Sequence, residues 1–223
     1  MLYDETAVRA NIRNREGKRV FYLRSEDTLT PLARDFLRQE RIEILPAKEA
    51  KPNRYRLLSG GFSEEKPEHM THLNGDVLVP KTHPRIRFRG MIDFLEAELL
   101  LCGEATREIL DLARKLIRCD VLNQPVGEIA LYGLTEEEQR KHSHFPQDYY
   151  GIPHFMPDYS DGEQVLRLNR CRSICRQAEL CAVEAFSDRD GNLTRGDIVQ
   201  ALNRMSSMLY ILMIREKSAG GKH

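Results

Sequence analysis

The sequence predicts a mainly α protein, a five-helix-type bundle preceded by a small amino-terminal αβ unit. Two observations predict this fold. From Pro84 onward, apolar residues recur at the helical period, and no strand pattern of any length interrupts them. Before that, two short runs typical of strands, 19–23 and 42–45, lie on either side of one helical segment. We therefore expect an αβ unit over residues 1–60 and a helical-bundle domain over residues 70–217.

The first bundle helix is expected from Pro84 to Leu101, since proline suits the first position of a helix. Its apolar stripe consists of Phe88, Ile92, Leu95 and Leu99. A polar stripe runs beside it and consists of Arg85, Arg89, Asp93 and Glu96. The basic start of this helix suggests a place where a multiply charged ligand meets the bundle, although an ordinary surface helix has the same pattern. The other four helices are expected over residues 104–120, 135–144, 162–186 and 194–215.

The amino-terminal unit has one clear helix start. Thr30-Pro31 is a typical cap, and the helix that it begins should run to about Arg41. Residues 46–70 are rich in Pro, Gly, Lys and Glu and have no sustained period. They are expected to form a linker or a mobile loop.

Composition excludes several classes of function. Lys+Arg and Asp+Glu both number 34, so no global charge draws the chain to nucleic acid or to an anionic membrane. The helix at Thr30 has no second recognition helix after it, which argues against a helix-turn-helix DNA reader. No apolar run approaches the ~18 residues of a membrane span, and the chain starts without the apolar core of a secretion signal. We expect a cytoplasmic protein.

The cysteines indicate packing rather than disulfides. There are five, an odd number, all within or near predicted helices, and none forms a C-x-x-C pair. We expect reduced, buried thiols. Cys171 and Cys175 are one helical turn apart and could ligate a soft metal, but they lack a nearby tetrahedral set.

The fourth helix carries candidate anion ligands. Arg172, Arg176 and Glu179 recur at helical spacing on one face. Guanidinium groups are always charged and bind phosphate oxygens in a bidentate manner, which suits a triphosphate. The alternative is an Arg–Glu ladder on a solvated helix face.

The fifth helix interrupts its apolar sequence with one polar cluster, made of Asn203, Arg204, Ser206 and Ser207. Buried amides and hydroxyls need partners, so this cluster should face either a ligand or another helix. Lys81 adds a cation just before the first bundle helix, where the free N–H groups of a helix start favour anions. The turn at residues 70–76, MTHLNGD, could cradle a phosphate.

A loop rich in aromatic residues and proline, residues 143–162, joins the third and fourth helices. It contains Phe145 and Phe155 among several other rings. Such a loop can pack on itself as a surface loop. It can also cover a large flat ligand, and both interpretations stay open from composition alone.

Taken together, these segments resemble the ATP:cob(I)alamin adenosyltransferases of the PduO-like superfamily, most closely its ethanolamine-utilisation branch. The resemblance covers most of the chain. It rests on four motifs in the family's order: TLTPLARDFL, THLNGDVLVPKTHPRIRFRGMID, LIRCDVLNQPVG and DIVQALNRMSSMLYILMI. It implies transfer of the 5'-deoxyadenosyl group of ATP to the cobalt of reduced cobalamin, with triphosphate as the leaving group and Mg²⁺ as the companion of ATP.

The resemblance also implies a nucleotide site. Lys81 matches a family lysine associated with ATP, Arg176 and Glu179 match the CRxAE residues, and Asn203 matches the asparagine of the NRLS segment. Ser207 stands where the wider superfamily often has aspartate. Thr71 and His72 belong to a shortened substitute for the glycine-rich ATP loop.

Cobalamin contacts and assembly are further implications of the resemblance. Asp93 matches an aspartate that pairs with an arginine of a neighbouring subunit, which here is Arg172, so both join Arg176 as expected catalytic residues. Relatives use an aromatic side chain to remove the lower base from cobalt, and Phe88, Phe145 and Phe155 are the candidates here. A homo-oligomer with sites between subunits is implied, a trimer in preference to a dimer.

The chain departs from the ethanolamine-utilisation branch in a motif that could bind a metal ion. Some members carry a His and a Cys-Cys-x-x-Cys cluster before the bundle, whereas this chain has no cysteine before Cys102. We therefore expect no structural zinc or iron. The alternative functions are a corrinoid escort or microcompartment-associated binding protein without turnover, and an unrelated structural bundle. As an enzyme, the protein would have an adenosylcobalamin-dependent enzyme or a reductase as its protein partner.

Overall fold

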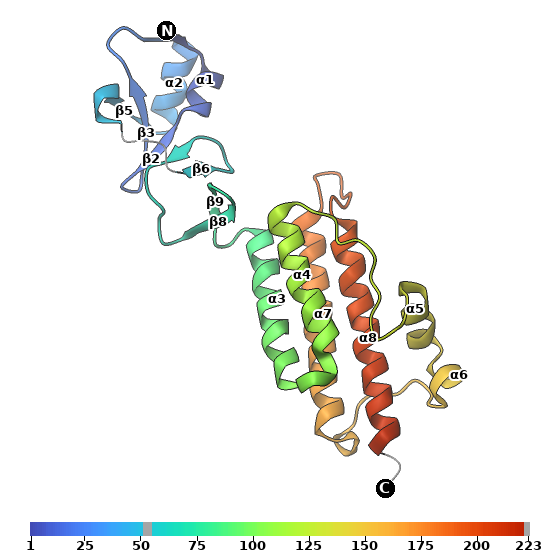
Figure 1. Cartoon of the computed structure of the whole chain (residues 1–223). Helices are drawn as coiled ribbons and strands as arrows, with labels where there is room; N and C mark the ends of the chain where they lie inside the picture. The colour runs from blue at the N-terminus through green and yellow to red at the C-terminus, as the bar shows by residue number, and fades with distance from the viewer. Residues whose placement is uncertain (51–54, 221–223) are drawn as a thin grey trace. The chain divides into compact units, whose positions relative to one another are not determined.

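The computed structural model describes residues 1–50 and 55–220. The chain divides into two compact units, Met1–His83 and Pro84–His223. The second unit is a helical bundle and the first contains a small sheet with two short helices (Figure 1). The predicted mainly α fold with a small amino-terminal unit is confirmed.

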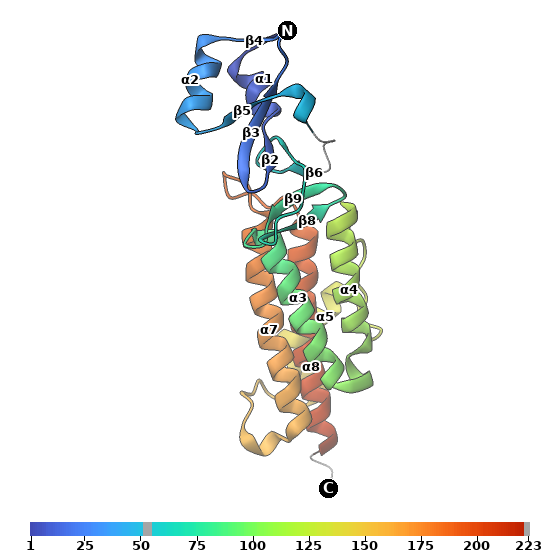
Figure 2. The same cartoon turned by 90° about the vertical axis from the view of Figure 1, so that its left-hand side faces the viewer.

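Long helices run side by side in the bundle unit, four of them in the described residues (Figures 1 and 2). They are α3 (Pro84–Leu101), α4 (Arg107–Leu122), α7 (Glu163–Phe186) and α8 (Gly196–Gly220). The shorter α5 (Glu136–His144) packs on α8, and α6 (Pro146–Tyr150) follows it. Two 3₁₀ turns, η2 (Gly103–Thr106) and η3 (Tyr159–Asp161), precede α4 and α7. Within the described residues, no helix is long and apolar enough to cross a membrane.

Local sequence accounts for the helix ends. Thr135 begins α5 with a complete capping box, in which its side chain accepts from the Glu138 backbone and Glu138 bonds back. At the end of α4, Asn123 adopts a left-handed conformation with φ 51°, which asparagine tolerates better than most residues.

The five predicted bundle helices match the observed ones to within a few residues, except that the last helix extends to Gly220.

The core of the bundle lies where the apolar stripes meet. Phe88, Ile92, Leu95 and Leu99 are all 0% exposed, as their spacing predicted. Phe88 makes an edge-to-face contact with Phe186 of α7, with ring centroids 5.5 Å apart. All five cysteines are free and buried, which confirms the sequence interpretation.

The basic start of α3 turns out to bind an internal carboxylate. Asp120 of α4 is 0% exposed, and its Oδ1 accepts from Arg85 Nε at 2.9 Å and Nη2 at 2.5 Å. Arg89 Nε donates to the other oxygen, Oδ2, at 2.7 Å. The first two arginines of the predicted polar stripe therefore join α3 to α4. Arg85 and Arg89 therefore bind a carboxylate of the bundle itself, and a charged ligand at the start of α3 stays a prediction for the other basic residues there.

The amino-terminal unit is richer in strands than its sequence suggests. In the described residues, its main sheet has seven strands in the order β5-β3-β2-β7-β6-β9-β8. They are β2 (Arg13–Arg15), β3 (Lys18–Leu23), β5 (Glu43–Pro46), β6 (Tyr55–Leu57), β7 (Phe62–Ser63), β8 (Met70–Asn74) and β9 (Val77–Pro80). A separate parallel pair joins β1 (Leu2–Tyr3) to β4 (Thr28–Leu29). The helices α1 (Glu5–Ala10) and α2 (Pro31–Gln39) share a core with β3 that includes Val8, Phe21 and Phe36, and the 3₁₀ turn η1 (Ala47–Glu49) follows β5.

Two expectations about this unit need correction. The segment 46–70 is not a linker in its described part, because β6 and β7 lie inside the sheet. Residues 51–54 of that segment are outside the described residues. Residues 70–83, expected with the bundle, contain the hairpin β8–β9 and belong to the first unit. The division between the units therefore falls after His83 rather than between residues 60 and 70.

Gly61 lies at a close approach between β7 and β2. Its φ is +81°, and a β-carbon there would lie 2.2 Å from the carbonyl oxygen of Ile12, which accepts from the Phe62 N–H at 2.7 Å. We expect Gly61→Ala to destabilise the amino-terminal unit by about 1–3 kcal/mol. Thermal unfolding followed by circular dichroism measures this loss. Gly60→Ala is the matched control, because Gly60 has a similar φ of +98° but open space around it. Equal unfolding midpoints for the two variants would contradict the clash.

Candidate functional site

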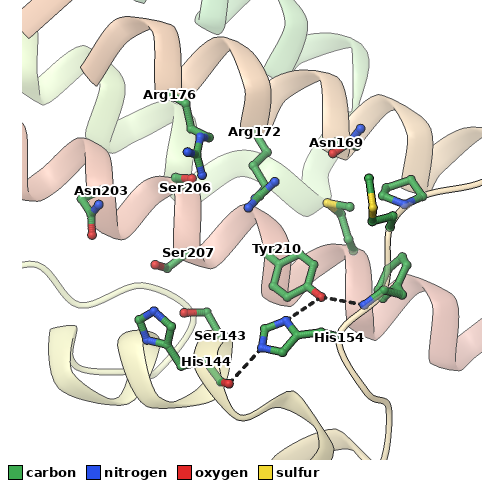
Figure 3. A pocket seen from close by; sticks show the side chains of 14 residues that line it. Ser143, His144, His154, Asn169, Arg172, Arg176, Asn203, Ser206, Ser207 and Tyr210 are labelled. Carbon is green, nitrogen blue, oxygen red and sulfur yellow. Dashed lines mark hydrogen bonds between the residues drawn. The ribbon is translucent and has the colours of Figure 1, made fainter. Parts of the chain in front are cut away.

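A cavity of about 680 Å³ lies between α7, α8, the end of α5 and the loop after α6 (Figure 3). Helix α7 contributes Asn169, Arg172 and Arg176. Helix α8 contributes Asn203, Ser206, Ser207, Tyr210 and Met213. The remaining wall is made by Ser143, His144, His154, Phe155, Met156 and Pro157. The volume is in the range of small-molecule sites.

Two guanidinium groups enter the cavity from α7. Arg172 and Arg176 are one turn apart and both extend toward α8 (Figure 3). Within the described residues, neither has a carboxylate at ion-pair distance, and Arg172 instead lies over the Tyr210 ring at 5.3 Å. Burial, and then the positive charge of Arg176, lower the pKa of the Arg172 guanidinium. Two adjacent cations without a counter-ion favour a bound anion.

Polar groups of α8 continue this side of the cavity. Asn203 Nδ2 donates to Glu179 Oε1 at 3.2 Å, and Arg204 Nη2 donates to Asn203 Oδ1 at 2.6 Å. The side-chain amide of Asn203 is thereby oriented by the Glu179 carboxylate, which accepts a hydrogen bond, and by the Arg204 guanidinium, which donates one. Ser206 and Ser207 lie nearer the centre of the cavity (Figure 3), where their hydroxyls can bond to a ligand.

The opposite wall is held by a cluster around Tyr210. The Tyr210 hydroxyl accepts from the Phe155 N–H at 3.1 Å and lies 3.2 Å from His154 Nδ1. His154 Nε2 lies 2.9 Å from the carbonyl oxygen of His144. Both rings of the loop stack on Tyr210, with centroids 5.7 Å away for His154 and 5.8 Å for Phe155. Helix α8 therefore supports a non-helical stretch of the loop, with Tyr210 making the hydrogen bonds and Lys217 lying over the Phe155 ring at 4.6 Å.

The lining of the cavity therefore has a polar, cationic side and an apolar side. The side made by α7 and the first half of α8 is cationic and rich in hydrogen-bonding groups. The side made by Phe155, Met156, Pro157 and Met213 is apolar, and Met156 is 91% exposed. A ligand with a polyanionic part and a large apolar face suits such a site.

Comparison with known proteins identifies the family of the chain. A family model described as cobalamin adenosyltransferase matches residues 62–216, which is well over half of the chain. The chain belongs to the cobalamin adenosyltransferase family. It is also 30% identical over 241 residues to the corrinoid adenosyltransferase EutT of Salmonella typhimurium strain LT2. The EutT of Escherichia coli strain K12 matches to the same extent, and each match covers 94% of this chain and 90% of the relative.

The structure brings together several of the residues that the sequence singled out in this family member. Arg172, Arg176, Asn203 and Phe155 all line the cavity, and Glu179 bonds to Asn203 at its edge. These residues come from three separate segments of the chain: α7, α8 and the aromatic loop.

Other candidate residues lie elsewhere. Phe88 is in the core of the bundle and is not a lining residue. Phe145 is 59% exposed at the junction of α5 and α6, next to the lining residue His144. Asp93 is exposed on α3 and, within the described part of the chain, has no ion-pair partner.

Three expected nucleotide ligands belong to the amino-terminal unit. Lys81 is exposed after β9, and its backbone N–H donates to the His69 carbonyl oxygen at 2.8 Å. Thr71 and His72 are in β8, so the turn expected to cradle a phosphate is a β-hairpin. His72 Nδ1 lies 3.0 Å from the Gly75 carbonyl oxygen inside that hairpin.

The cysteines have packing partners in the core. Cys171 Sγ is 3.5 Å from Cys102 Sγ, and Cys175 Sγ donates to the Leu202 carbonyl oxygen at 3.3 Å. The Cys102 thiol and burial raise the pKa of Cys171, and burial raises the pKa of Cys175. Raised pKa values disfavour the thiolate that binds metals. Among the residues described, no three His, Cys, Asp or Glu side chains are grouped to hold a metal ion.

Sequence reasoning missed Tyr210 and His154. One signal was available for Tyr210, because it is the one residue with a polar side-chain tip in the apolar run MLYILMI. A buried tyrosine hydroxyl usually has a hydrogen-bond partner. Nothing in the sequence indicates that the partner is 55 or 56 residues away.

Proposed function

We propose that the chain transfers the 5'-deoxyadenosyl group of ATP to the cobalt of reduced cobalamin, giving adenosylcobalamin and triphosphate in support of ethanolamine utilisation. The observation that carries this proposal is a pair of arginines in one cavity that have no counter-ion within the described residues of the chain and that lie opposite an aromatic wall. Family membership supports the same reaction. We extend the proposal to a cytoplasmic enzyme associated with a bacterial microcompartment, on the resemblance to the ethanolamine-utilisation branch.

The arginine side of the cavity would bind the triphosphate. Cobalt(I) attacks the ribose C5', the C5'–O5' bond breaks, and both electrons of that bond leave with the triphosphate. Negative charge therefore develops on the leaving oxygen. Arg176 would stabilise that charge without rearranging, and preorganised electrostatic stabilisation of this kind is usually the largest single contribution to catalysis. No protein nucleophile is needed, because the corrinoid supplies it.

A magnesium ion would accompany the nucleotide. Mg²⁺ keeps several waters and uses phosphate oxygens with one or two protein carboxylates. Glu179 fits as that carboxylate, since its Oε1 is held by Asn203 at the edge of the cavity. Bound there, the ion supplies further neutralisation of the triphosphate.

The apolar wall would hold the corrin ring. Phe155 is half-buried, its ring stacks on Tyr210, and Lys217 Nζ lies over the same ring at 4.6 Å, so the ring is held in place by α8. We propose Phe155 as the aromatic group that excludes the lower base from cobalt(II), in preference to Phe145 and Phe88. Its place in the cavity lining supports this choice.

We also propose that the site is completed between subunits of a homo-oligomer, with Asp93 of one copy paired to Arg172 of the next. The exposure of Asp93 and the absence of a carboxylate beside Arg172 within the described residues support such a pair. On the resemblance to the family alone, Lys81, Thr71 and His72 stay proposed nucleotide ligands.

A charge swap tests the pair between subunits. Asp93→Arg or Arg172→Asp alone should weaken assembly by about 2 kcal/mol, roughly 30-fold in Kd, because like charges meet at the contact. The double variant should recover assembly. Light scattering across a dilution series measures this, and a fully active monomeric wild type would contradict the shared site. Glu104→Arg is the control, since Glu104 is exposed at η2.

The reaction itself is tested by adenosylcobalamin formation from ATP and chemically reduced cobalamin, with triphosphate assayed in parallel and Mg²⁺ as the only added metal. Equal amounts of the two products support the proposal. Tight corrinoid binding without turnover would instead identify an escort protein.

A further inference from the structure

We infer that Tyr210 is a positioning residue that holds the corrinoid-facing wall of the cavity through its hydroxyl, an inference that rests on the proposed function. The stretch from His154 to Pro157 is neither helix nor strand, yet it forms most of the apolar wall. Its backbone at Phe155 and the imidazole of His154 both bond to one oxygen atom of α8, the Tyr210 Oη, and Lys217 of α8 lies over the Phe155 ring at 4.6 Å. Among the described residues, the hydrogen bonds between this stretch and α8 therefore depend on the Tyr210 hydroxyl.

The hydrogen bonds around Tyr210 form a directed chain. The His144 carbonyl oxygen can only accept, so His154 carries a hydrogen on Nε2, and in the neutral ring Nδ1 is an acceptor. Tyr210 therefore donates its O–H to His154 Nδ1 and accepts the Phe155 N–H on the same oxygen. One hydroxyl thus joins α8, the loop and, through His154, the last turn of α5.

The same side chain separates the two sides of the cavity. The guanidinium of Arg172 lies over one part of the Tyr210 ring at 5.3 Å, whereas the loop rings stack beside it. A phenylalanine at this position keeps the ring, and hence the stacking and the cation–π contact. The Tyr210→Phe variant loses only the hydrogen bonds between the Tyr210 hydroxyl and the loop. The hydroxyl is therefore expected to affect corrinoid binding and to leave nucleotide binding unchanged.

The test compares Tyr210→Phe with Tyr132→Phe. Tyr132 is the matched control, because its hydroxyl also makes a hydrogen bond, to the Ala105 carbonyl oxygen at 2.7 Å, and it is not a lining residue. We expect Tyr210→Phe to raise the KM for cobalamin about tenfold, the effect of losing two ordinary hydrogen bonds, and to leave the KM for ATP within about twofold. The Tyr132→Phe enzyme should match the wild type in both constants. An unchanged cobalamin KM in Tyr210→Phe, or an equal rise in both KM values, would overturn the inference.

Hydrogen exchange gives a readout that needs no turnover. The Phe155 amide is protected by its bond to Tyr210, so the peptide over residues 152–157 should exchange faster in Tyr210→Phe and not in Tyr132→Phe. Unchanged exchange in this peptide would overturn the inference. Failure of the proposed function looks different, because the wild type would then make no adenosylcobalamin at all.

A variant on the loop side covers the case in which Tyr210→Phe folds poorly. His154→Leu removes the partner of the hydroxyl and leaves α8 intact. If the two residues act as one unit, His154→Leu raises the cobalamin KM in the same way, and the double variant is no worse than the single ones. Fully additive effects, or a normal KM in His154→Leu, would show that Tyr210 does not act through the loop.

Discussion

Replacing Arg176 with alanine is expected to lower kcat/KM for ATP by about 10²- to 10³-fold, the usual cost of removing one preorganised donor to a developing anion. Arg176 lines the cavity beside Arg172, and no carboxylate within the described residues neutralises it. Its charge is therefore free to act on a bound triphosphate. Triphosphate release under saturating reduced cobalamin measures the loss.

Two further variants make this result specific. Arg176→Lys retains the charge but not the planar fork, so an intermediate activity is expected. Arg107→Ala is the control, because Arg107 lies outside the cavity, 68% exposed in its side chain, and pairs with Glu104. Full activity in Arg176→Ala would remove this arginine from the nucleotide site.

Asp120→Asn is expected to destabilise the bundle by about 3–5 kcal/mol. The carboxylate is 0% exposed and neutralises both Arg85 and Arg89, whose side chains are only 22% and 15% exposed. Removing the acid takes away the buried carboxylate that neutralises two poorly solvated cations, which is far more costly than losing a surface ion pair. Thermal unfolding followed by far-ultraviolet circular dichroism should show a midpoint lower by roughly 10 °C.

The matched control is Asp111→Asn on the same helix. Asp111 is exposed and has no ion-pair partner within the described part of the chain, so its variant should unfold within about 0.5 kcal/mol of the wild type. If Asp120→Asn unfolds like this control, the arginines find other partners and the buried network is not structural.

The two units differ in how far their sequences predicted them. Helices of the bundle have long apolar stripes, and a period sustained over several turns is a strong local signal. The amino-terminal strands are as short as two residues, such as β7 at Phe62–Ser63, and no period can be read over that length. Their pairing joins segments far apart in sequence, for example Arg13 to Phe62. Residues 46–70, whose composition is typical of a linker, therefore contribute strands to the sheet in their described part.

The start of α3 shows that a sequence pattern can predict a helix face without predicting what that face contacts. Its arginines were predicted on one polar face, and they do share one face. The spacing says nothing of what that face meets, and the partner is Asp120, 31 to 35 residues further along the chain. A basic helix start that binds a ligand and one that binds a buried carboxylate have the same sequence pattern.

For the site, helix register alone placed Arg172 and Arg176 on one face of α7, and placed Asn203 among the polar residues of α8. These predictions needed only the rise and turn of an α-helix, which each residue's neighbours determine. The order of the family's motifs along the chain likewise needed no structure. Tertiary structure decided which faces meet. It put Phe155 in the cavity and brought His154 to Tyr210, because contacts across a loop depend on how helices pack and not on any local period.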